Sequence, residues 1–335
     1  MMQKIRGFEM YLEDVNIEGF KSFSEKTNMS FQPGIGVIIG NNGVGKSNIL
    51  DAIVWALGEN DLERIRCYEQ EELFFSGSKK YPPAATIRIE LNLKENQDKD
   101  APATQLVREM TKTGQNGYWI NDTNVNADAY LAKLKQLRLK QSLKTIIRQE
   151  QINDFLQQSP PRRFQTIQSL LEIESTDEVI ECLDRTVAPL LQRYMRYLMP
   201  LGEVKLKTLS QNGQIGFEII VTLPGNRMRR VHQLSGGEKS VTSLALKLAL
   251  FSQLESCFYL MDEVEPSLDY TNHKSMQAFL KDVAADKQLI MITHLRSTID
   301  LAETLHGVRT RFDGSSFMKF YFLMHERLLR MYKCC

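Results

Sequence analysis

The spacing of apolar residues predicts strands in the first third of the chain. Leu12, Val15 and Ile17 recur in a strand-like pattern along MYLEDVNIE, and TIRIELNL carries its apolar residues at every second position, which are Ile87, Ile89, Leu91 and Leu93. YWINDTN has the composition of a hairpin. These segments together predict an antiparallel sheet.

A second set of segments is apolar without alternation. The short runs GVIIG, CFYLM and QLIMIT are typical of central strands that are covered on both faces. SVTSLALKLALFSQL is long and apolar on most sides, which predicts a buried helix, and EVKLKTL and FEIIVTL predict two more strands. Strands and helices mixed in this way predict an α/β fold.

The middle of the chain reads as helical. We expect a helix from about residue 127 to residue 144, and another that starts near Pro161 and stops near Glu174. Ser175 and Glu178 form an S-x-x-E capping box that would start a returning helix. Apolar residues follow it at helical spacing, namely Val179, Ile180, Leu183, Val187, Leu190 and Leu191. The pattern predicts a helical hairpin.

Composition narrows the class of protein. The 335 residues are 42% hydrophobic and 25% charged, with a formal net charge of +1, so any nucleic-acid contact must come from local clusters. No apolar run is long enough to predict a membrane span or a signal peptide. The cysteines are scattered without metal-ligand spacing, at Cys67, Cys182, Cys257, Cys334 and Cys335. These features predict a reduced, cytoplasmic protein.

One glycine-rich segment carries a phosphate-binding pattern. GNNGVGKS matches G-x-x-x-x-G-K-[ST] and lies between a predicted strand and a predicted helix. Lys46 would supply a positive charge to the phosphates and Ser47 a hydroxyl to Mg²⁺. The alternative is a turn that merely redirects the chain. The expected nucleotide-binding residues are Gly40, Asn41, Asn42, Gly43, Val44, Gly45, Lys46, Ser47 and Asn48.

Two further segments complete an ATPase pattern. CFYLMDE is an apolar strand ending in two acids, of which Asp262 would hold Mg²⁺ and Glu263 would orient or deprotonate the attacking water. In LSGGEKS, Ser235 and Glu238 form a capping box that opens the long helix. The same turn, with Gly236 and Gly237, could bind the γ-phosphate of a nucleotide. Both interpretations can hold together.

These motifs resemble the ATP-binding-cassette superfamily, and within it the heads of bacterial-type structural maintenance of chromosomes (SMC) proteins. ALGEN, FFSGS, RQEQINDFLQQSP, DEVEPSLD and ITHLRSTIDLAETLHGV add to the resemblance, which covers about residues 10 to 312. It implies a mixed central sheet flanked by helices plus an antiparallel β-subdomain. It also implies an N-terminal lobe (1–174), a truncated neck hairpin (175–200) and a C-terminal lobe (201–335).

The resemblance implies roles for four more residues. Gln149 matches the glutamine that senses Mg²⁺ and water, Asp269 the aspartate that contacts the partner head, and His294 the histidine beside the γ-phosphate. Taken singly, they could be a strand end, a helix cap and a core histidine. Arg66 matches the phosphate-proximal arginine, but its loop reads LERIRCYEQEE where the family carries glycines.

The function implied is an Mg-ATP-dependent ATPase of the cytoplasm and nucleoid. Its heads would dimerise around two ATP molecules, with a kleisin-type subunit as a further partner, in chromosome organisation or DNA repair. The helical hairpin stands where the family has a long coiled-coil arm, which fits an engineered head or a natural arm-less relative equally. Alternatives are a RecF-like DNA-repair ATPase and a non-catalytic nucleotide-dependent clamp.

DNA is a further expected partner, bound without sequence specificity. Two basic clusters suggest contact with phosphates: Lys133, Lys135, Arg138 and Lys140, and then Arg227, Arg229 and Arg230. A solvated basic face is the alternative for either cluster.

Overall fold

The structure is a computed structural model that describes residues 10–95, 103–211, 214–223, 225, 227–264 and 273–323. The chain divides into two compact units, each built from separate stretches of sequence. The first unit comprises Met1–Ile146, Ser256–Asp262 and Ala284–Cys335, and the second comprises Ile147–Glu255 and Glu263–Val283. The division into lobes and neck expected from the sequence stays a prediction.

The antiparallel sheet expected from the alternating segments lies in the first unit. Its strand order is β2-β1-β4-β5-β6-β7. The strands are β1 (Met10–Glu18), β2 (Thr27–Ser30), β4 (Thr86–Glu95), β5 (Thr104–Thr111), β6 (Asn116–Ile120) and β7 (Thr123–Val125). In β4 every second residue is buried, from Ile87 to Leu93, so the alternation marks the face of the sheet that packs on the core.

The central sheet is mixed and has the order β15-β14-β3-β13-β12-β8. The strands are β3 (Ile35–Ile39), β8 (Ile146–Arg148), β12 (Phe258–Asp262), β13 (Gln288–Ile292), β14 (Thr304–Thr310) and β15 (Ser316–Leu323). β14, β3, β13 and β12 pair in parallel, whereas β15 is antiparallel to β14. Every residue of β12 and β13 is buried, which explains their continuous apolar sequences.

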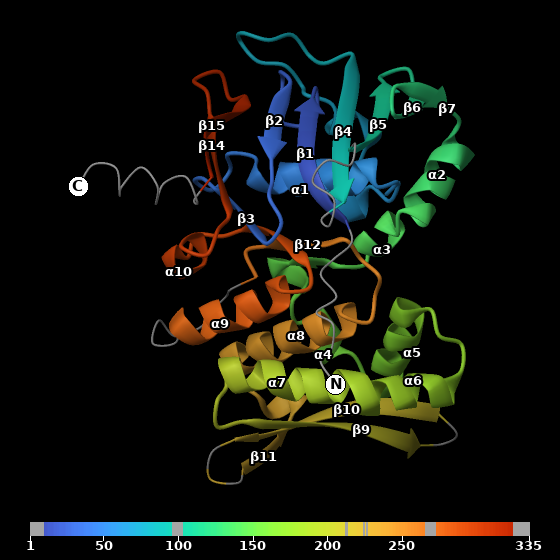
Figure 1. Ribbon diagram of the computed structural model, residues 1–335, viewed down its shortest axis with the longest axis vertical. Coiled ribbons are helices and arrows are strands. Elements are labelled where there is room, and N and C mark those ends of the chain that lie inside the picture. Colours follow the sequence, from blue (N-terminus) through green and yellow to red (C-terminus); the bar gives the residue numbers. More distant parts are fainter. Residues whose placement is uncertain are drawn as a thin grey trace, which may run out of the picture. The chain divides into compact units, whose positions relative to one another are not determined.

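The main helix of the first unit, α1 (Lys46–Ala56), contacts β1 and β4 of the antiparallel sheet and β12 of the central sheet (Figure 1). It therefore lies between the two sheets, which explains why nine of its positions are buried. The other helical elements are α2 (Ala127–Gln136), α3 (Leu139–Ser142), α10 (Arg296–Ile299), and two 3₁₀ turns, Glu63–Ile65 and Gln70–Leu73.

The helix expected over 127–144 is wrong in its extent. Asn126 caps α2 by accepting a hydrogen bond from the Ala129 amide, but α2 ends at Gln136. Arg138 adopts a left-handed conformation with φ of 58°, and this breaks the helical geometry before α3 starts. The charged face that the sequence suggested is thus divided between two short helices.

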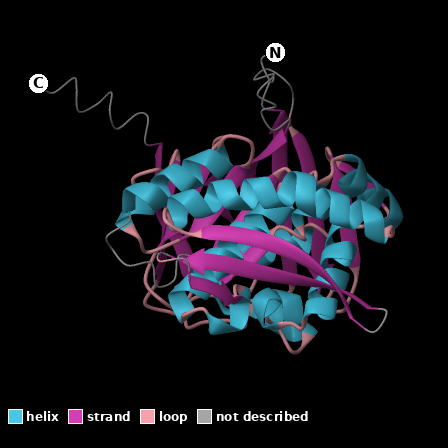
Figure 2. Ribbon diagram, turned by 90° about the horizontal axis from the view of Figure 1, so that it is seen from below, coloured by secondary structure: helices cyan, strands magenta, loops and turns pink. Residues whose placement is uncertain are grey.

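The second unit contains a three-stranded antiparallel sheet and a set of helices. The sheet has the order β11-β10-β9, with β9 (Glu203–Gln211), β10 (Gln214–Leu223) and β11 (Arg227–Arg230). Its two longer strands cross the foreground of Figure 2. The helices are α4 (Asp154–Gln157), α5 (Pro160–Leu171), α6 (Thr176–Cys182), α7 (Ala188–Leu198), α8 (Gly236–Phe251) and α9 (His273–Ala284), with 3₁₀ turns at Gln149–Gln151 and Val231–Gln233.

The end of one helix and the start of the next expected near residue 175 are confirmed, whereas their role as a neck that replaces a coiled coil stays a prediction. α5 ends at Leu171, and Ser175 caps α6 by accepting a hydrogen bond of 3.4 Å from the Glu178 amide. A π-helical segment, Leu183–Val187, joins α6 to α7. The apolar residues at helical spacing that become fully buried are Val179, Leu183, Val187 and Leu191.

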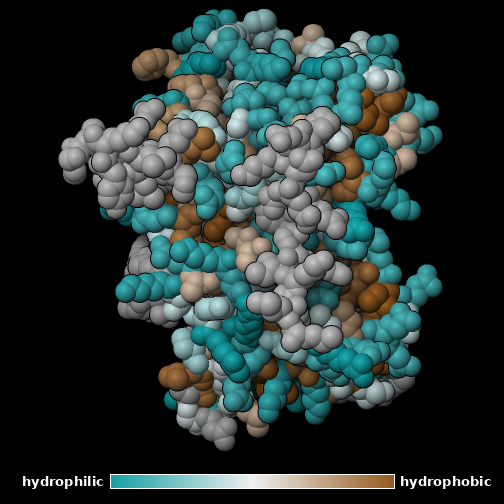
Figure 3. Space-filling model, in the orientation of Figure 1, coloured by the Kyte–Doolittle hydropathy of each residue, from teal (hydrophilic) through white to brown (hydrophobic). Residues whose placement is uncertain are grey.

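The face of the molecule drawn in Figure 3 is mostly hydrophilic. The face drawn in Figure 3 shows hydrophobic residues only in small, separate groups among hydrophilic ones. Within the described ranges, the structure contains no helix with the length and apolar character needed to cross a lipid bilayer.

The mixed α/β class expected from the sequence is confirmed.

Candidate functional site

The phosphate-binding pattern GNNGVGKS, residues 40–47 and here called the phosphate loop, forms the turn between β3 and α1 and the start of α1. Gly43 and Gly45 have φ of 78° and 94°, in the left-handed region where other residues are strained. A Cβ on Gly40 would lie 2.5 Å from the Val308 carbonyl oxygen, so this position also requires glycine. No side chain caps the first turn of α1, and its amides are oriented as in helix N-termini that bind anions.

Lys46 connects this loop to the predicted histidine. Its ammonium donates hydrogen bonds to the carbonyls of Gly40, at 2.8 Å, and Asn41, at 3.1 Å. Nζ also lies 3.2 Å from Nε2 of His294. This separation is short enough for a hydrogen bond between the two side chains. The lysine side chain reaches the loop interior and is only 5% exposed.

Strand register brings three predicted groups to one edge of the central sheet. Ile38 of β3 pairs with Ile292 of β13, and Ile292 pairs with Asp262 of β12. Gly40 and His294 each follow two residues after their paired strand residue. The phosphate loop, the buried Asp262 carboxylate and His294 therefore leave the same carboxyl edge of parallel strands, where ligands bind in open α/β sheets.

A cleft of about 280 Å³ lies at this edge, within the first unit. It is lined by Ile39, Gly40, Asn41, Thr293, His294, Ile299, Gly307, Val308, Arg309 and Phe320. The cleft thus includes the start of the phosphate loop and the predicted histidine.

Two serines that no sequence motif indicated form hydrogen bonds with the phosphate loop and with the start of α1. Ser316 donates a hydrogen bond of 2.7 Å from Oγ to the Val44 carbonyl, and its own amide donates to the Ser22 carbonyl at 2.7 Å. Ser22 Oγ accepts from the Asn48 amide group at 2.9 Å. Only the tertiary structure brings Ser316 here, because it lies at the start of β15, far along the chain.

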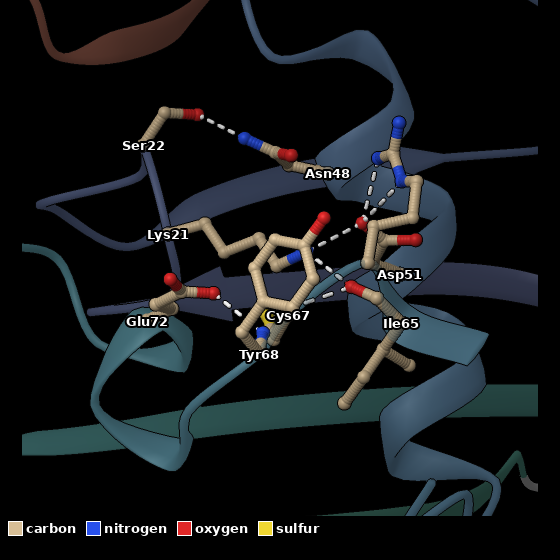
Figure 4. Close-up of polar contacts among 9 residues, drawn as sticks. Lys21, Ser22, Asn48, Asp51, Ile65, Cys67, Tyr68 and Glu72 are labelled. Atoms are coloured by element: carbon tan, nitrogen blue, oxygen red, sulfur yellow. Dashed lines mark hydrogen bonds and ion pairs between the residues drawn. The ribbon is translucent and has the colours of Figure 1, made fainter. Parts of the chain in front are cut away.

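The predicted arginine, Arg66, pairs with Asp51 on α1. Figure 4 shows the Asp51 carboxylate beside Lys21. Arg66 contacts Asp51 Oδ2 through Nη2 at 2.6 Å and Nε at 3.2 Å, and Lys21 Nζ reaches the same oxygen at 2.7 Å. Lys21 also donates to the Ile65 carbonyl. Asp51 is fully buried, so two cations compensate one desolvated carboxylate. The predicted contact of Arg66 with a nucleotide stays a prediction.

The acid that follows Asp262 has a special backbone conformation. Glu263 adopts φ of 48°, which is uncommon for a residue with a side chain. Local geometry of this kind is concentrated at functional sites, although Glu263 is the first residue of the second unit and its role as a base stays a prediction.

The turn LSGGEKS, residues 234–240 and here called the signature turn, opens α8 in the second unit. Ser235 Oγ accepts from the Glu238 amide at 3.4 Å, and Glu238 Oε2 accepts from the Ser235 amide at 2.7 Å, so the capping box is confirmed. Arg229 lies beside it, with Nη1 3.8 Å from Glu238 Oε2. A Cβ built on Gly236 would meet no atom within 4 Å. The capping role and an anion-binding role remain compatible.

Gln149 also lies in the second unit, where it is exposed at the start of a 3₁₀ turn, Gln149–Gln151. Asp269 lies outside the described residues, as do Cys334 and Cys335. Among the described residues, no cluster of three or more His, Cys, Asp or Glu side chains could by itself hold a metal ion.

Comparison with known proteins gives consistent matches. Residues 11–316 match the model of the RecF/RecN/SMC N terminal domain. The Chromosome partition protein Smc of Fusobacterium nucleatum is 44% identical over 117 residues, which are 34% of this chain and 10% of that protein. The match thus spans only about a tenth of its length.

Two solved structures have the same fold. The SmcHead bound to the C-winged helix domain of ScpA has a TM-score of 0.85 and 28% identity, and the alignment covers 95% of this chain and 99% of that one. The SMC head domain from Thermotoga maritima has a TM-score of 0.65 and 29% identity, with 92% and 98% covered.

Proposed function

The chain belongs to the RecF/RecN/SMC N terminal domain family, and we propose that it is an SMC-type head that binds Mg-ATP, pairs with a second head and hydrolyses ATP. The observation that carries this proposal is the register of β3, β13 and β12. That register gathers the phosphate loop, Asp262 and His294 at one sheet edge. The high similarity to solved SMC heads favours this function over a RecF-like one.

The loop fits a nucleotide polyphosphate. Gly43 and Gly45 allow its amides to face one concave site, and the α1 N-terminus and the Lys46 ammonium favour negative charge there. Phosphate oxygens would compete with the Gly40 and Asn41 carbonyls for Lys46. His294 would then lie next to the terminal phosphate through its contact with Lys46.

The residues present also fit Mg²⁺. This ion prefers oxygen ligands and usually combines one or two protein groups with phosphates and water. Ser47 and Asp262 would supply a hydroxyl and a carboxylate, and Gln149 an amide oxygen. When bound, the ion would neutralise charge on the phosphates. A cage made only of protein side chains is not required for such a site.

Glu263 would act as the base. A carboxylate next to the metal-binding aspartate can hold the attacking water and accept its proton. Ser235, Gly236 and Gly237 would bind the terminal phosphate held by a second copy, because amides of a helix N-terminus bind anions. ATP would then hold two heads together, and hydrolysis would release them. Asp269 would contact the partner head.

Further partners are proposals from relatives and from charge. One similar SmcHead is bound to a winged-helix domain of ScpA, and we propose a kleisin-type subunit here as well. DNA is proposed as a non-specific partner through the basic residues of α2, α3 and β11. The expected location is the cytoplasm, in association with the nucleoid.

The test compares turnover in three proteins. Glu263→Gln keeps the size of the side chain and removes its basicity, so ATP should bind normally and turnover should fall by about 100-fold or more. Asp286→Asn removes an exposed acid and should keep wild-type turnover. Absence of turnover in the wild-type protein, despite ATP binding, would instead support a non-catalytic clamp.

A further inference from the structure

Three polar residues form a stripe along α8, a helix that is buried over most of its length. Ser240, Ser243 and Lys247 lie within about 60° of one another around the helix axis, because successive residues turn by about 100°. The positions between them are buried and mostly apolar, from Val241 to Leu246. Lys247 itself is half-buried, which is unusual for a lysine because burial disfavours its charge.

The stripe holds three consecutive residues of a distant segment. Lys247 Nζ donates to the Gln151 carbonyl at 2.5 Å, and Ser243 Oγ donates to the Ile152 carbonyl. The side-chain amide of Asn153 donates to Ser240 Oγ at 3.3 Å. These bonds link residues that lie 87 to 96 positions apart in the sequence.

The fastened segment directly follows Gln149. Gln149–Gln151 is a single 3₁₀ turn, closed by a hydrogen bond of 3.3 Å from the Ile152 amide to the Gln149 carbonyl. A turn this short has little stability of its own, so its position depends on what holds its end. The structure supplies that support through α8.

The side chains of the stripe can hold residues 151–153 firmly against α8. Ser243 is fully buried, and its hydroxyl satisfies a carbonyl that a short loop would otherwise leave without a helical partner. Burial lowers the pKa of Lys247 to about 8, and the nearby Asp154 carboxylate partly opposes this shift. Replacement of the lysine by an apolar residue would remove that desolvation penalty, yet the segment would lose a donor.

We infer that Ser240, Ser243 and Lys247 are positioning residues that hold Gln149 in place from the helix that begins at the signature turn. The inference rests on the proposed function, in which Gln149 contacts Mg²⁺ and water. Because α8 is one continuous helix, any displacement of Ser235 by a bound phosphate would be passed to the Gln149 turn. The two nucleotide sites of a dimer would be coupled in this way.

The main test removes two donors. The double variant Ser243→Ala/Lys247→Met should bind ATP within about twofold of wild type, whereas kcat should fall by about tenfold because Gln149 is displaced. The Mg²⁺ concentration for half-maximal turnover should rise by about tenfold. Lys247→Arg, which keeps a donor, should retain most of the activity in the presence of Ser243.

A matched control removes the same groups elsewhere in the second unit. Ser252 donates to the Ala249 carbonyl after the end of α8, and Lys281 is exposed on α9. Ser252→Ala/Lys281→Met should keep wild-type kcat and Mg²⁺ dependence. Should the double variant fail to fold, Lys247→Met alone, with both serines intact, carries the same test at a smaller effect.

Amide hydrogen exchange separates this inference from the proposed function. The amides of residues 149–153 should exchange faster in the double variant than in wild type or the control, whether or not the protein hydrolyses ATP. Wild-type exchange in the double variant would overturn the inference even if the protein is an ATPase. If the wild-type protein hydrolyses ATP, faster exchange with unchanged kcat and Mg²⁺ dependence would also overturn it. A wild-type protein without turnover would contradict the proposed function. Faster exchange in the double variant would even then support the conclusion that α8 holds residues 149–153.

Discussion

Lys46 Nζ lies 3.2 Å from His294 Nε2, although 248 positions separate the two residues in the sequence. The contact exists because β3 and β13 are hydrogen-bonded neighbours whose carboxyl ends coincide. It links the residue expected to bind phosphate with the residue expected to lie beside the terminal phosphate. Nucleotide binding should therefore depend on both ends of this contact.

Lys46→Ala should weaken ATP binding by about 100-fold or more, because it removes a charged donor from an enclosed loop. Isothermal titration calorimetry of the purified protein measures the effect. Lys319→Ala, on an exposed position of β15, serves as the control and should bind like wild type. An unchanged affinity in Lys46→Ala would refute the phosphate-loop assignment.

Asp51→Asn should lower the free energy of unfolding by about 3–5 kcal/mol, because Lys21 and Arg66 would lose their shared carboxylate. Urea denaturation measures this change, with Asp300→Asn as an exposed control. Adding Arg66→Met to Asp51→Asn should recover part of the loss, since one uncompensated cation is removed. A loss below about 1 kcal/mol would show that the pair contributes little.

Stability should fall in mild acid because of His306. It is fully buried between Phe31 and Tyr321, and burial lowers its pKa from 6.5 to about 4. Between these values the unfolded chain binds a proton that the folded chain does not, so the free energy of unfolding decreases as pH falls. From pH 7 to pH 5 the contribution is about 2 kcal/mol.

The check for His306 is urea denaturation at both pH values. His306→Phe keeps an aromatic ring and should lose about 2 kcal/mol less than wild type between pH 7 and pH 5. The exposed His232 provides a control, since His232→Gln should retain the wild-type dependence. Equal pH dependence in His306→Phe and wild type would assign the effect to other groups.

Two arginines of β11 have different acidic neighbours. Arg229 lies beside Glu238 of the signature turn, whereas Arg230 Nε lies 3.5 Å from Glu218 of β10. Arg227→Gln/Arg230→Gln should weaken DNA association and reduce the slope of log affinity against log salt by about two, because fewer counterions are released. Fluorescence anisotropy over a salt series measures it. An unaltered slope would assign both arginines to a solvated face.

Arg229→Gln is the companion variant for the signature turn. It should change ATP-dependent dimerisation as well as DNA binding, because Glu238 loses a neighbouring positive charge. If Arg229→Gln alters DNA binding and leaves ATP-dependent dimerisation unchanged, Arg229 has no role in the signature turn.

Glu263→Gln should accumulate as a dimer when ATP and Mg²⁺ are both present, because binding is retained and hydrolysis is slow. ADP should not suffice. Adding Ser235→Arg should restore the monomer while leaving ATP binding intact, since it places bulk and charge at the proposed interface. Light scattering measures the molecular mass. A Glu263→Gln protein that binds ATP and stays monomeric at tens of micromolar would contradict the shared site.

The sequence by itself determined the elements whose signals are local. The glycine pattern before Lys46, the S-x-x-E box at Ser235 and the apolar run that ends at Asp262 each depend on neighbouring residues, so they were readable without a fold. The same holds for the hairpin near Ser175. It does not hold for α2 and α3, where Arg138 adopts a conformation that helical periodicity could not reveal.

Only the tertiary structure decided which distant groups meet. Ser316 supports the phosphate loop, Asp51 binds both Arg66 and Lys21, and Lys247 holds the segment after Gln149. No spacing in the sequence encodes these contacts, because they depend on strand register and on how a helix turns its faces. The physical reason is that a hydrogen bond or ion pair forms between atoms a few ångströms apart, and chain folding alone sets that separation for residues far apart in sequence.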